Sequence, residues 1–221
     1  MLSRQEAASQ LVYWSRQMIA KGLAWGNAGN ASIRVGADRF LVTASGSSLG
    51  NLTESDLVEV SLDGKVIGSS GRRPSKEAPM HAAIYSERPD INAVAHAHPF
   101  YSLIIACSSE EIPRNWFVEN MYYLERTARV EYYHPGSKEL AEGVRRAARK
   151  ANLLILNNHG ILAYDVNFQE ALMGLESFEL ASKMYVVCRG AGIPIPGLPA
   201  ETVGEFLEKS AYKPRREWPE K

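Results

Sequence analysis

The sequence has few cysteines, no long uncharged apolar stretch and no excess of either charge. Its 221 residues include two cysteines, Cys107 and Cys188, which lie far apart in apolar stretches. That spacing excludes a disulfide framework and a thiolate zinc site, so we expect both side chains in the core. The start of the chain, residues 1–6, is charged where a signal peptide would be apolar, and no uncharged run approaches the ~18 residues that span a bilayer. We therefore expect a cytoplasmic protein.

The charge balance narrows the class of partner. Lys and Arg together number 25, as do Asp and Glu, so the formal net charge is zero and the pI is about 7.0. Nothing indicates a basic surface for nucleic acid or for a membrane, and a small-molecule substrate fits better. The length suits one sizeable core, and we expect a single domain over residues 1–221.

The most informative stretch is AVAHAHP, residues 93–99. Side chains alternate faces along a strand, so His96 and His98 are expected to project from the same face. Neutral imidazole is the commonest ligand of Zn²⁺ and similar ions, and two imidazoles in one place begin a divalent metal site. A pair of histidines that hydrogen-bond to each other is the competing interpretation, and other parts of the chain must decide between the two.

Further residues with suitable chemistry lie elsewhere in the sequence. His159 follows the apolar strand expected at 153–156, in the turn Asn-His-Gly, so a strand end delivers it. A helix from about 77 to 86 places Glu77 and His81 on one face, at i and i+4. Alternatively, Glu77 only offsets the helix dipole and His81 packs beneath it. His134 stands beside a proline in a loop and is expected at the surface.

Two loops rich in small residues are candidate anion sites. They cover residues 26–32 (GNAGNAS) and 43–48 (TASGSS), next to strands expected at 32–35 and 40–43. If these strands pair, the loops lie side by side and together offer several backbone N–H groups to an anion. Taken singly, each loop is more simply a surface turn, because short glycine patterns are weak motifs.

Periodicity and capping signals predict a mixed α/β fold. Capping boxes are expected at Ser3 with Glu6 and at Asn167 with Glu170. We expect helices at about 4–21, 77–86, 100–107, 137–150, 168–189 and 201–210. Strands are expected at 32–35, 40–43, 58–60, 65–67, 91–98, 130–133, 153–156 and 161–164, with a hairpin at Asp63-Gly64 and an irregular region at 109–129 that holds one short strand at most. Strands outnumber the helical connections, so the helices should pack on a largely antiparallel, mixed central sheet.

Four separated motifs occur in one order: Gly-Asn-Ala-Ser at 29–32, Pro-Ser-Lys-Glu at 74–77 with His81 four residues on, His-Ala-His-Pro at 96–99, and Asn-His-Gly at 158–160. On these motifs the chain resembles the class II aldolase and adducin-head family, on the side of its L-fuculose-1-phosphate aldolases. The resemblance runs from the first helix to about residue 190, and agreement of all four motifs makes it specific.

The resemblance implies a metal-dependent lyase. His96, His98 and His159 match the family's zinc-binding histidines, and Glu77 matches the acidic residue that meets the metal and acts as the acid/base. The ion, expected to be Zn²⁺, would bind ketose oxygens and stabilise the enediolate left when a carbon–carbon bond breaks. The positions implied for binding the substrate's phosphate are Gly29, Asn30, Ser45, Gly46, Ser75 and Lys76. The family also implies a homotetramer with active sites at subunit interfaces and a small phosphorylated sugar or sugar acid as substrate.

Two positions depart from the family's pattern. Lys76 stands where the fuculose phosphate enzymes have a second serine, and its charge would serve a phosphate or a carboxylate equally well. Phe117 stands where the family has a proton-donating tyrosine, so Tyr122, Tyr123 or Tyr212 would have to replace it. The first hypothesis is an aldolase that cleaves a small phosphorylated ketose. The alternatives are a decarboxylase of a phosphorylated β-keto sugar acid at the same site, and a non-catalytic, adducin-like interaction module.

Overall fold

The computed structural model describes residues 2–69, 71–216 and 218. Its strands are β1 (Asn30–Gly36), β2 (Arg39–Thr43), β3 (Leu57–Ser61), β4 (Val66–Ile67), β5 (Ala93–Ala97), β6 (Thr127–Val130), β7 (Leu153–Leu156) and β8 (Gly160–Asp165). Its α-helices are α1 (Arg4–Ala20), α2 (Ala78–Glu87), α3 (Phe100–Ala106), α4 (Val118–Tyr123), α5 (Lys138–Ala148), α6 (Phe168–Ala191) and α7 (Ala200–Lys209), and short 3₁₀ turns lie at Leu49–Asn51 and Glu54–Asp56. Within this described part, no helix is long and apolar enough to cross a membrane.

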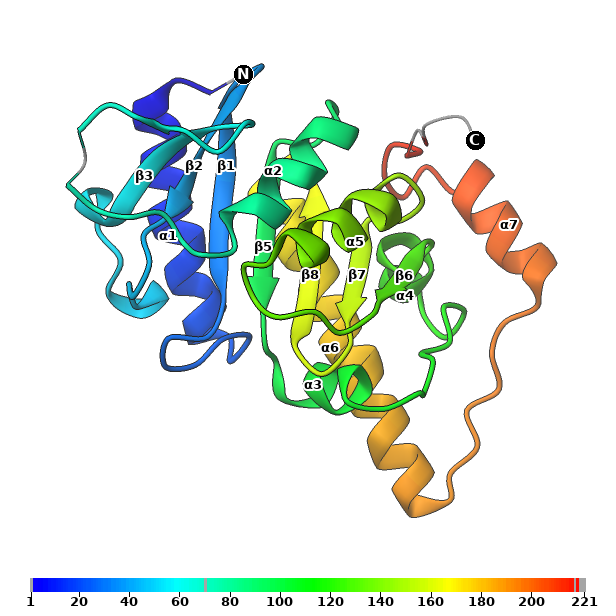
Figure 1. The fold of residues 1–221 in the computed structure, drawn as a ribbon. Helices are drawn as coiled ribbons and strands as arrows, with labels where there is room; N and C mark the ends of the chain where they lie inside the picture. Colours follow the sequence, from blue (N-terminus) through cyan, green and yellow to red (C-terminus); the bar gives the residue numbers. More distant parts are fainter. Residues whose placement is uncertain (1, 70, 217, 219–221) are drawn as a thin grey trace.

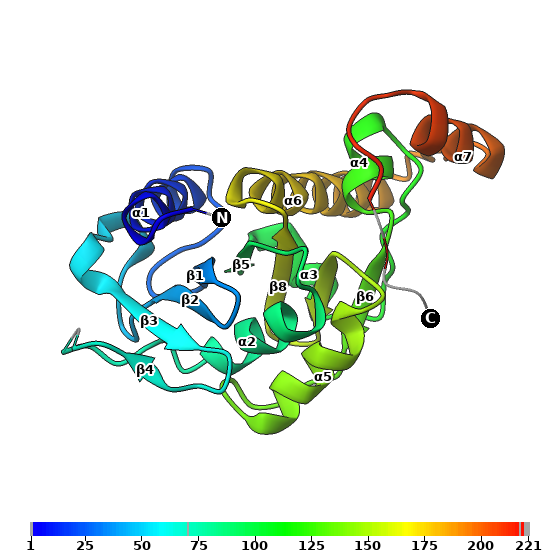
Figure 2. The same cartoon turned by 90° about the horizontal axis from the view of Figure 1, so that it is seen from above.

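The strands form one sheet in the order β4-β3-β2-β1-β5-β8-β7-β6 (Figure 1). Neighbouring strands are antiparallel except β6 and β7, which are parallel. Figure 2 shows helices on both faces, with α1 and α6 on one side and α2 and α5 on the other. The predicted fold class, helices on a largely antiparallel mixed sheet, is confirmed.

Side-chain alternation along β5 separates two cores. Ala93, Ala95 and Ala97 belong to the core beneath α1 and α6, whereas Val94 belongs to the core beneath α2 and α5. Because the strand has a period of two, His96 shares the face of Val94 and points toward the α2 side. The sheet therefore brings its first candidate ligand to the face where α2 begins.

The predicted capping and turn signals explain most element boundaries. Ser3 and Glu6 form the expected capping box of α1. The Asp63-Gly64 turn joins β3 to β4, with Gly64 at a φ of 87°. Asn167 caps α6 by accepting from the Glu170 N–H, but the Glu170 carboxylate turns to Tyr123 and Lys213 instead of closing the reciprocal half of the box. Only half of that second capping box is therefore present.

Two expectations were wrong. The region 109–129 contains α4 and the start of β6, and the strand expected at 130–133 instead runs from Thr127 to Val130. Parallel pairing with β7, in which Thr127 lies opposite Leu153, sets that position. The cysteines are not core residues, because Cys107 is exposed at the end of α3 and Cys188 is only half-buried in the last turns of α6.

Candidate metal centre

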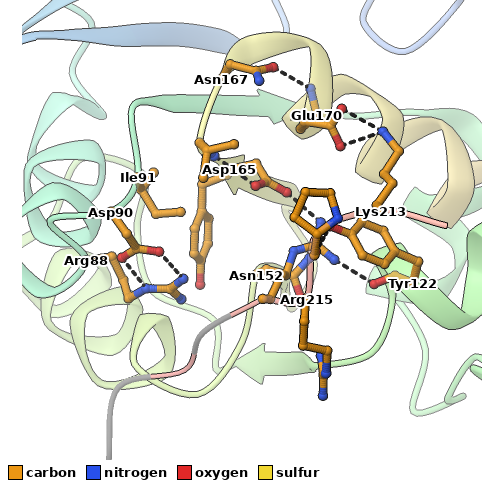
Figure 3. A pocket seen from close by; sticks show the side chains of 14 residues that line it. Arg88, Asp90, Ile91, Tyr122, Asn152, Asp165, Asn167, Glu170, Lys213 and Arg215 are labelled. Carbon is orange, nitrogen blue, oxygen red and sulfur yellow. Dashed lines mark hydrogen bonds and ion pairs between the residues drawn. The ribbon is translucent and has the colours of Figure 1, made fainter. Parts of the chain in front are cut away.

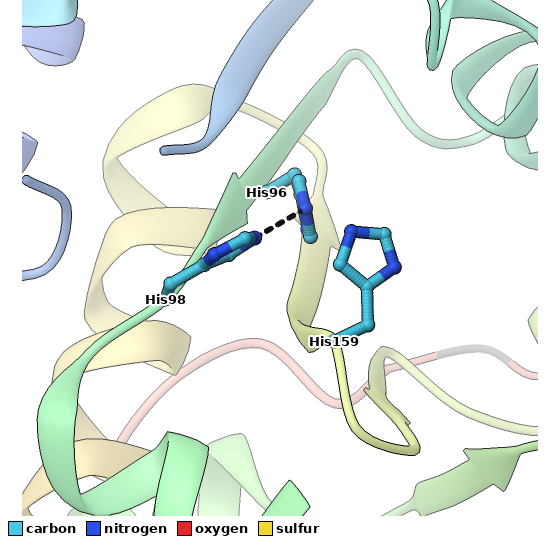
Figure 4. Close-up of side chains that lie close together, drawn as sticks. All are labelled: His96, His98 and His159. Carbon is cyan, nitrogen blue, oxygen red and sulfur yellow. Dashed lines mark hydrogen bonds between the residues drawn. The ribbon is translucent and has the colours of Figure 1, made fainter. Parts of the chain in front are cut away.

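Three histidine rings converge at one end of the sheet (Figure 4). His96 lies near the end of β5, His98 follows two residues later, and His159 lies in the turn that joins β7 to β8. One ring nitrogen of each lies within 4.8 Å of the others, and Nε2 of His96 is 2.9 Å from Nε2 of His98. The pairing of Ala97 with Ile161 brings the β7–β8 turn beside the end of β5, which explains how His159 joins residues so far away in the sequence.

The tautomer of His96 is fixed by the backbone. Its Nδ1 lies 3.0 Å from the carbonyl oxygen of Ile161, which can only accept, so Nδ1 carries the proton and Nε2 presents a lone pair. Burial lowers the pKa of His96 to about 4 although the Glu77 carboxylate acts in the other direction, and burial likewise lowers the pKa of His98 to about 3. Both rings are therefore neutral at physiological pH, which is the form that binds a metal.

Glu77 stands at the N-cap of α2, and its carboxylate does not cap the helix. Oε1 lies 3.1 Å from Nε2 of His159, and Oε2 lies 3.4 Å from Nε2 of His96. Burial by itself would raise the pKa of this carboxyl, but the neighbouring imidazoles and a hydrogen bond from Asn30 together lower it well below its usual value. The side chain is thus an ionised carboxylate directed at the three rings.

The donor set fits a divalent cation. In the described part of the chain, Oε1 of Glu77 and Nδ1 of His159 are buried without a hydrogen-bond partner. The lone pair of His96 Nε2 and the carboxylate of Glu77 face each other with no proton to share. In a tetrahedral zinc site with Zn–N bonds of about 2.0–2.1 Å, ligand nitrogens lie roughly 3.3 Å apart, close to the spacing of His96 and His98. Three imidazoles and a carboxylate therefore suit a zinc-like ion.

Asn30, at the start of β1, connects Glu77 to His81. Its Nδ2 donates to Oε2 of Glu77 at 2.8 Å, and its Oδ1 lies 2.6 Å from Nε2 of His81. On the far side of the ring, Nδ1 of His81 lies 2.7 Å from Oγ of Ser32, which lies 2.8 Å from the hydroxyl of Tyr85. Glu77 at the N-cap of α2 and His81 inside the helix both reach Asn30, in line with their i, i+4 spacing, so the residue that joins them comes from β1.

Ser32 and Tyr85 are members of this hydrogen-bonded group that no motif in the sequence singled out as polar contacts of His81. Both were within reach of the same periodicity argument, since Ser32 lies two residues after Asn30 on one strand and Tyr85 lies four residues after His81 on one helix. The sequence does not show that α2 packs over β1, and this packing is what brings Ser32 and Tyr85 together.

The loops expected to bind an anion do lie side by side. β1 pairs with β2, so Asn30 at the start of one strand approaches Thr43 at the end of the other. The Ser45 N–H donates to Arg73 O at 2.9 Å, and the Ser75 N–H donates to Thr43 O at 3.0 Å. Both amides are thus engaged in joining the 43–48 loop to the segment at 73–75. Each serine hydroxyl at these positions can still donate its proton to an anion, although Oγ of Ser75 accepts from the Glu77 N–H at 3.2 Å.

Gly46 and Lys76 are two more of the six residues predicted to bind the phosphate. Gly46 has a φ of 79°, in the left-handed region that glycine adopts freely. The Lys76 side chain is exposed, and its backbone oxygen is so close to Gly136 that a Cβ on the glycine would lie 2.8 Å away. The loop that carries His134, which is exposed as expected, therefore packs against the loop that carries Lys76.

Gly29 holds the first of these loops against the metal centre. It has a φ of 88°, and a Cβ at this position would lie 2.6 Å from the backbone oxygen of His96. Only glycine allows both that conformation and that close approach. The glycine predicted for phosphate binding thus has a structural role beside one of the candidate metal ligands.

The candidate proton donors lie on the other face of the sheet in this chain. The Tyr122 hydroxyl donates to Pro214 O and the Tyr123 hydroxyl to Glu170, each at 2.9 Å. Phe117 packs against the core on the α6 side, to which both tyrosines also belong. The imidazole of His96 projects to the α2 side, so the structure does not bring these aromatic residues to the histidines of the same chain.

A separate cavity of about 430 Å³ lies at the opposite end of β5 and β8 (Figure 3). The C-terminal segment lines it and docks there, with Arg216 paired to Asp165 at 2.6 Å and Lys213 paired to Glu170 at 2.7 Å. None of the three histidines lines this cavity. It is where the end of the chain is anchored and not part of the metal centre.

Comparison with known proteins agrees with the fold. The family described as Class II Aldolase and Adducin N-terminal domain matches residues 9–186. A 3-oxo-tetronate 4-phosphate decarboxylase of Haemophilus influenzae is 32% identical over 87% of this chain and 91% of its own. A 5-methylthioribulose-1-phosphate/5-deoxyribulose-1-phosphate aldolase of Escherichia coli is 32% identical over 94% of this chain and 96% of its own. The solved structure of an L-fuculose 1-phosphate aldolase, 30% identical, has a TM-score of 0.84 and covers 96% of this chain and 99% of its own.

The chain therefore belongs to the class II aldolase and adducin family, as its four motifs predicted. Its place is among the enzymes of the class II aldolase superfamily, which use a divalent metal. The named relatives divide between carbon–carbon cleavage of a ketose phosphate and decarboxylation of a phosphorylated oxo acid. Both chemistries act on phosphorylated sugars or sugar acids.

Proposed function

We propose that this protein is a metal-dependent carbon–carbon lyase of aldolase type that cleaves a small phosphorylated ketose. The observation that supports it best is the ionised Glu77 carboxylate set against three converging imidazoles. A carboxylate beside a metal can take a proton from a substrate hydroxyl and return it to carbon. Nothing in a purely adhesive module needs such a buried and charged group.

Each polar group has a role in this proposal. His96, His98 and His159 would hold the ion, for which we propose Zn²⁺, with Glu77 beside them. When bound, the ion supplies a Lewis acid that polarises a substrate oxygen. Glu77 moves the proton, and the hydrogen bond from Asn30 fixes the orientation of its carboxylate.

The substrate's phosphate is assigned to the loop cluster beside Asn30. The cluster consists of Gly29, Asn30, Ser45, Gly46, Ser75 and Lys76, of which the serine hydroxyls and the lysine ammonium would contact the anion. Lys76 is exposed, so its ammonium group can meet an anion without the free-energy cost of burying a charge.

A decarboxylase of a phosphorylated β-keto sugar acid is the second candidate, and Phe117 favours it. Retro-aldol cleavage benefits from a general acid that protonates the departing aldehyde oxygen, typically a ~10²–10⁴-fold effect, whereas loss of carbon dioxide needs no acid at that place. Phe117 cannot donate a proton. A 3-oxo-tetronate 4-phosphate decarboxylase is among the relatives, at the same 32% identity as the 5-methylthioribulose-1-phosphate/5-deoxyribulose-1-phosphate aldolase.

We further propose a homotetramer with active sites at subunit interfaces. Two large aromatic side chains next to the histidines are exposed: Trp25, whose Nε1 donates to His98 O at 3.2 Å, and Phe100 on α3. Exposed apolar groups beside a polar site are typical of a surface that a partner covers. Across such an interface Tyr212, which is partly exposed, would be the donor that replaces Phe117. Light scattering measures the mass of the assembly and so tests the tetramer. If Tyr212 is the donor, Tyr212→Phe should slow aldol cleavage and leave the metal content unchanged.

Two measurements test the proposal. Elemental analysis of freshly purified protein should find about one divalent ion per chain, and His159→Ala should lower that content. Turnover is then measured with fuculose 1-phosphate, 5-methylthioribulose 1-phosphate and 3-oxo-tetronate 4-phosphate. Aldehyde release from a ketose phosphate supports the aldolase, and carbon dioxide release without aldehyde from any ketose phosphate supports the decarboxylase. Protein that holds no metal and turns over none of these, even with added zinc, would be an adducin-like module.

The proposed compartment is the cytoplasm. Both cysteines are free thiols in the structure, as a reducing compartment allows. Cell fractionation with an antibody to the chain tests this assignment.

A further inference from the structure

A continuous chain of hydrogen bonds runs from Glu77 into the protein interior. It passes through Asn30, His81 and Ser32 to Tyr85, and each of the last four residues is at least 94% buried, since their exposures are 6, 0, 0 and 1%. We propose that His81 is a positioning residue, which holds the Asn30 amide in one orientation and thereby fixes the carboxylate of Glu77. The inference rests on the acid/base role proposed above for Glu77.

The direction of every hydrogen bond in this chain follows from its first member. An ionised carboxylate only accepts, so Asn30 must present its NH₂ group to Glu77 and its oxygen to His81. That oxygen only accepts as well, so Nε2 of His81 must donate. The ring is neutral, because burial lowers its pKa to about 4, and its other nitrogen must therefore accept.

The remaining two links obey the same rule. Nδ1 of His81 accepts from the Ser32 hydroxyl, whose oxygen in turn accepts from the hydroxyl of Tyr85. Every donor in the chain thus points toward Glu77. If His81 carried its proton on Nδ1, Asn30 would have to turn its oxygen to the carboxylate, and two acceptors would face each other at 2.8 Å in a buried site.

The end of the hydrogen-bond chain farthest from Glu77, at Tyr85, is anchored in the core. The Arg34 guanidinium lies 4.7 Å from the centre of the Tyr85 ring and donates to the Tyr85 backbone oxygen at 2.7 Å. Tyr85 is on α2 and Ser32 on β1, so the chain also ties the helix that carries Glu77 to the strand that carries Asn30. The Tyr85 hydroxyl, which lies away from the metal centre, therefore helps to fix the orientation of the Glu77 carboxylate.

The tautomer of His81 can be observed directly. The protein contains five histidines, so ¹⁵N spectra of histidine-labelled, zinc-saturated protein hold five rings, and the His81 signals are those lost in His81→Gln. We expect a neutral ring with its proton on Nε2. A proton on Nδ1 overturns the proposal.

Matched tyrosine variants test the far end by kinetics. Tyr85→Phe removes the last donor of the hydrogen-bond chain. Tyr164→Phe is the control, because Tyr164 is also 1% exposed and its hydroxyl donates to Ala151 O at 2.8 Å, outside that network. We expect kcat to fall about 2- to 10-fold in Tyr85→Phe, the range that corresponds to one neutral hydrogen bond, with KM unchanged. Tyr164→Phe should keep the kcat of the native protein. Equal kcat values in the two variants overturn the proposal.

Matched histidine variants test the central link. His81→Gln can keep an N–H donor where Nε2 stood, whereas His81→Leu has similar volume and no donor. We expect kcat to fall on the order of 10-fold or more in His81→Leu and to recover most of the loss in His81→Gln, with metal content the same in both. Equal kcat values overturn the proposal, and if His81→Leu does not fold, the tyrosine pair and the ¹⁵N spectrum still decide. If the native protein has no turnover on any substrate, the proposed function fails while the spectrum alone still tests the hydrogen-bond chain.

Discussion

The close approach of Gly29 to the backbone of His96 should make Gly29→Ala far more harmful than an ordinary glycine substitution. Gly29 has a φ of 88°, and an added Cβ would lie 2.6 Å from His96 O. Gly64 offers a matched control, because it has a φ of 87° with open space around the added carbon. The two substitutions share the same backbone strain and differ only in the clash.

The expected losses of folding stability follow from the positive φ and from the 2.6 Å approach to His96 O. A non-glycine residue in the left-handed region loses about 1–2 kcal/mol of stability, and this is all that Gly64→Ala should lose. Gly29→Ala must in addition displace a carbonyl oxygen that is held in the β1–β5 pairing, an overpacking effect of about 1–3 kcal/mol. The total for Gly29→Ala is about 2–5 kcal/mol. Because the displaced carbonyl belongs to His96, zinc affinity should fall as well.

Urea unfolding measures the difference in stability, and all proteins are compared at one concentration because the stability of an assembly depends on it. Competition with a zinc chelator measures the affinity. Equal losses of stability in Gly29→Ala and Gly64→Ala, with unchanged zinc affinity in both, would refute the argument that the glycine is required by its contact with β5.

Three further predictions concern the acid/base, pH and the C-terminal segment. Glu77→Gln should keep the fold and lower kcat by a factor on the order of 10² or more, the size usual for a positioned acid/base, and a near-native kcat would make Glu77 structural only. His81 has a pKa of about 4 when folded against about 6.5 when unfolded, so only the unfolded chain binds its proton between these values. The free energy of unfolding of the metal-free protein should therefore fall as the pH drops from about 6.5 to about 4, and less steeply in His81→Gln; identical slopes would contradict this. Arg216→Ala leaves the Asp165 carboxylate buried without its partner, so trypsin should cut after Arg215 faster than in the native chain while metal content stays constant; an unchanged cleavage rate would show that this pair does not hold the segment.

The local patterns of the sequence were enough to predict most of the candidate site. The period of two along the strand expected at 91–98 predicted that His96 and His98 lie together, and the i, i+4 spacing predicted the same of Glu77, the N-cap of α2, and His81. Both patterns are local, because they depend only on the geometry of one strand or one helix. The four motifs then supplied the family, which the comparisons confirm.

Contacts between distant segments could not be obtained in this way. The helix α4 lies in a region without a clear apolar period, and β6 is placed by a parallel partner that comes after α5 in the chain. A parallel pair has no turn to mark its register, so nothing near Thr127 in the sequence indicates where the strand begins. The misplaced cysteines have a related cause, since α3 and α6 both end near solvent and an apolar neighbourhood in sequence does not reveal that.

The sequence by itself determined which residues are the candidates for the chemistry: three histidines, a carboxylate at a helix start, and loops of small residues. Tertiary structure decided how they are connected. The β5–β8 register brings His159 to the other rings, and the packing of α2 on β1 joins Asn30 to Glu77 and His81. Residue identity and spacing fix which groups a chain can offer, but a hydrogen bond forms only between atoms about 3 Å apart, and for residues some 50 positions apart only the folded chain sets that distance.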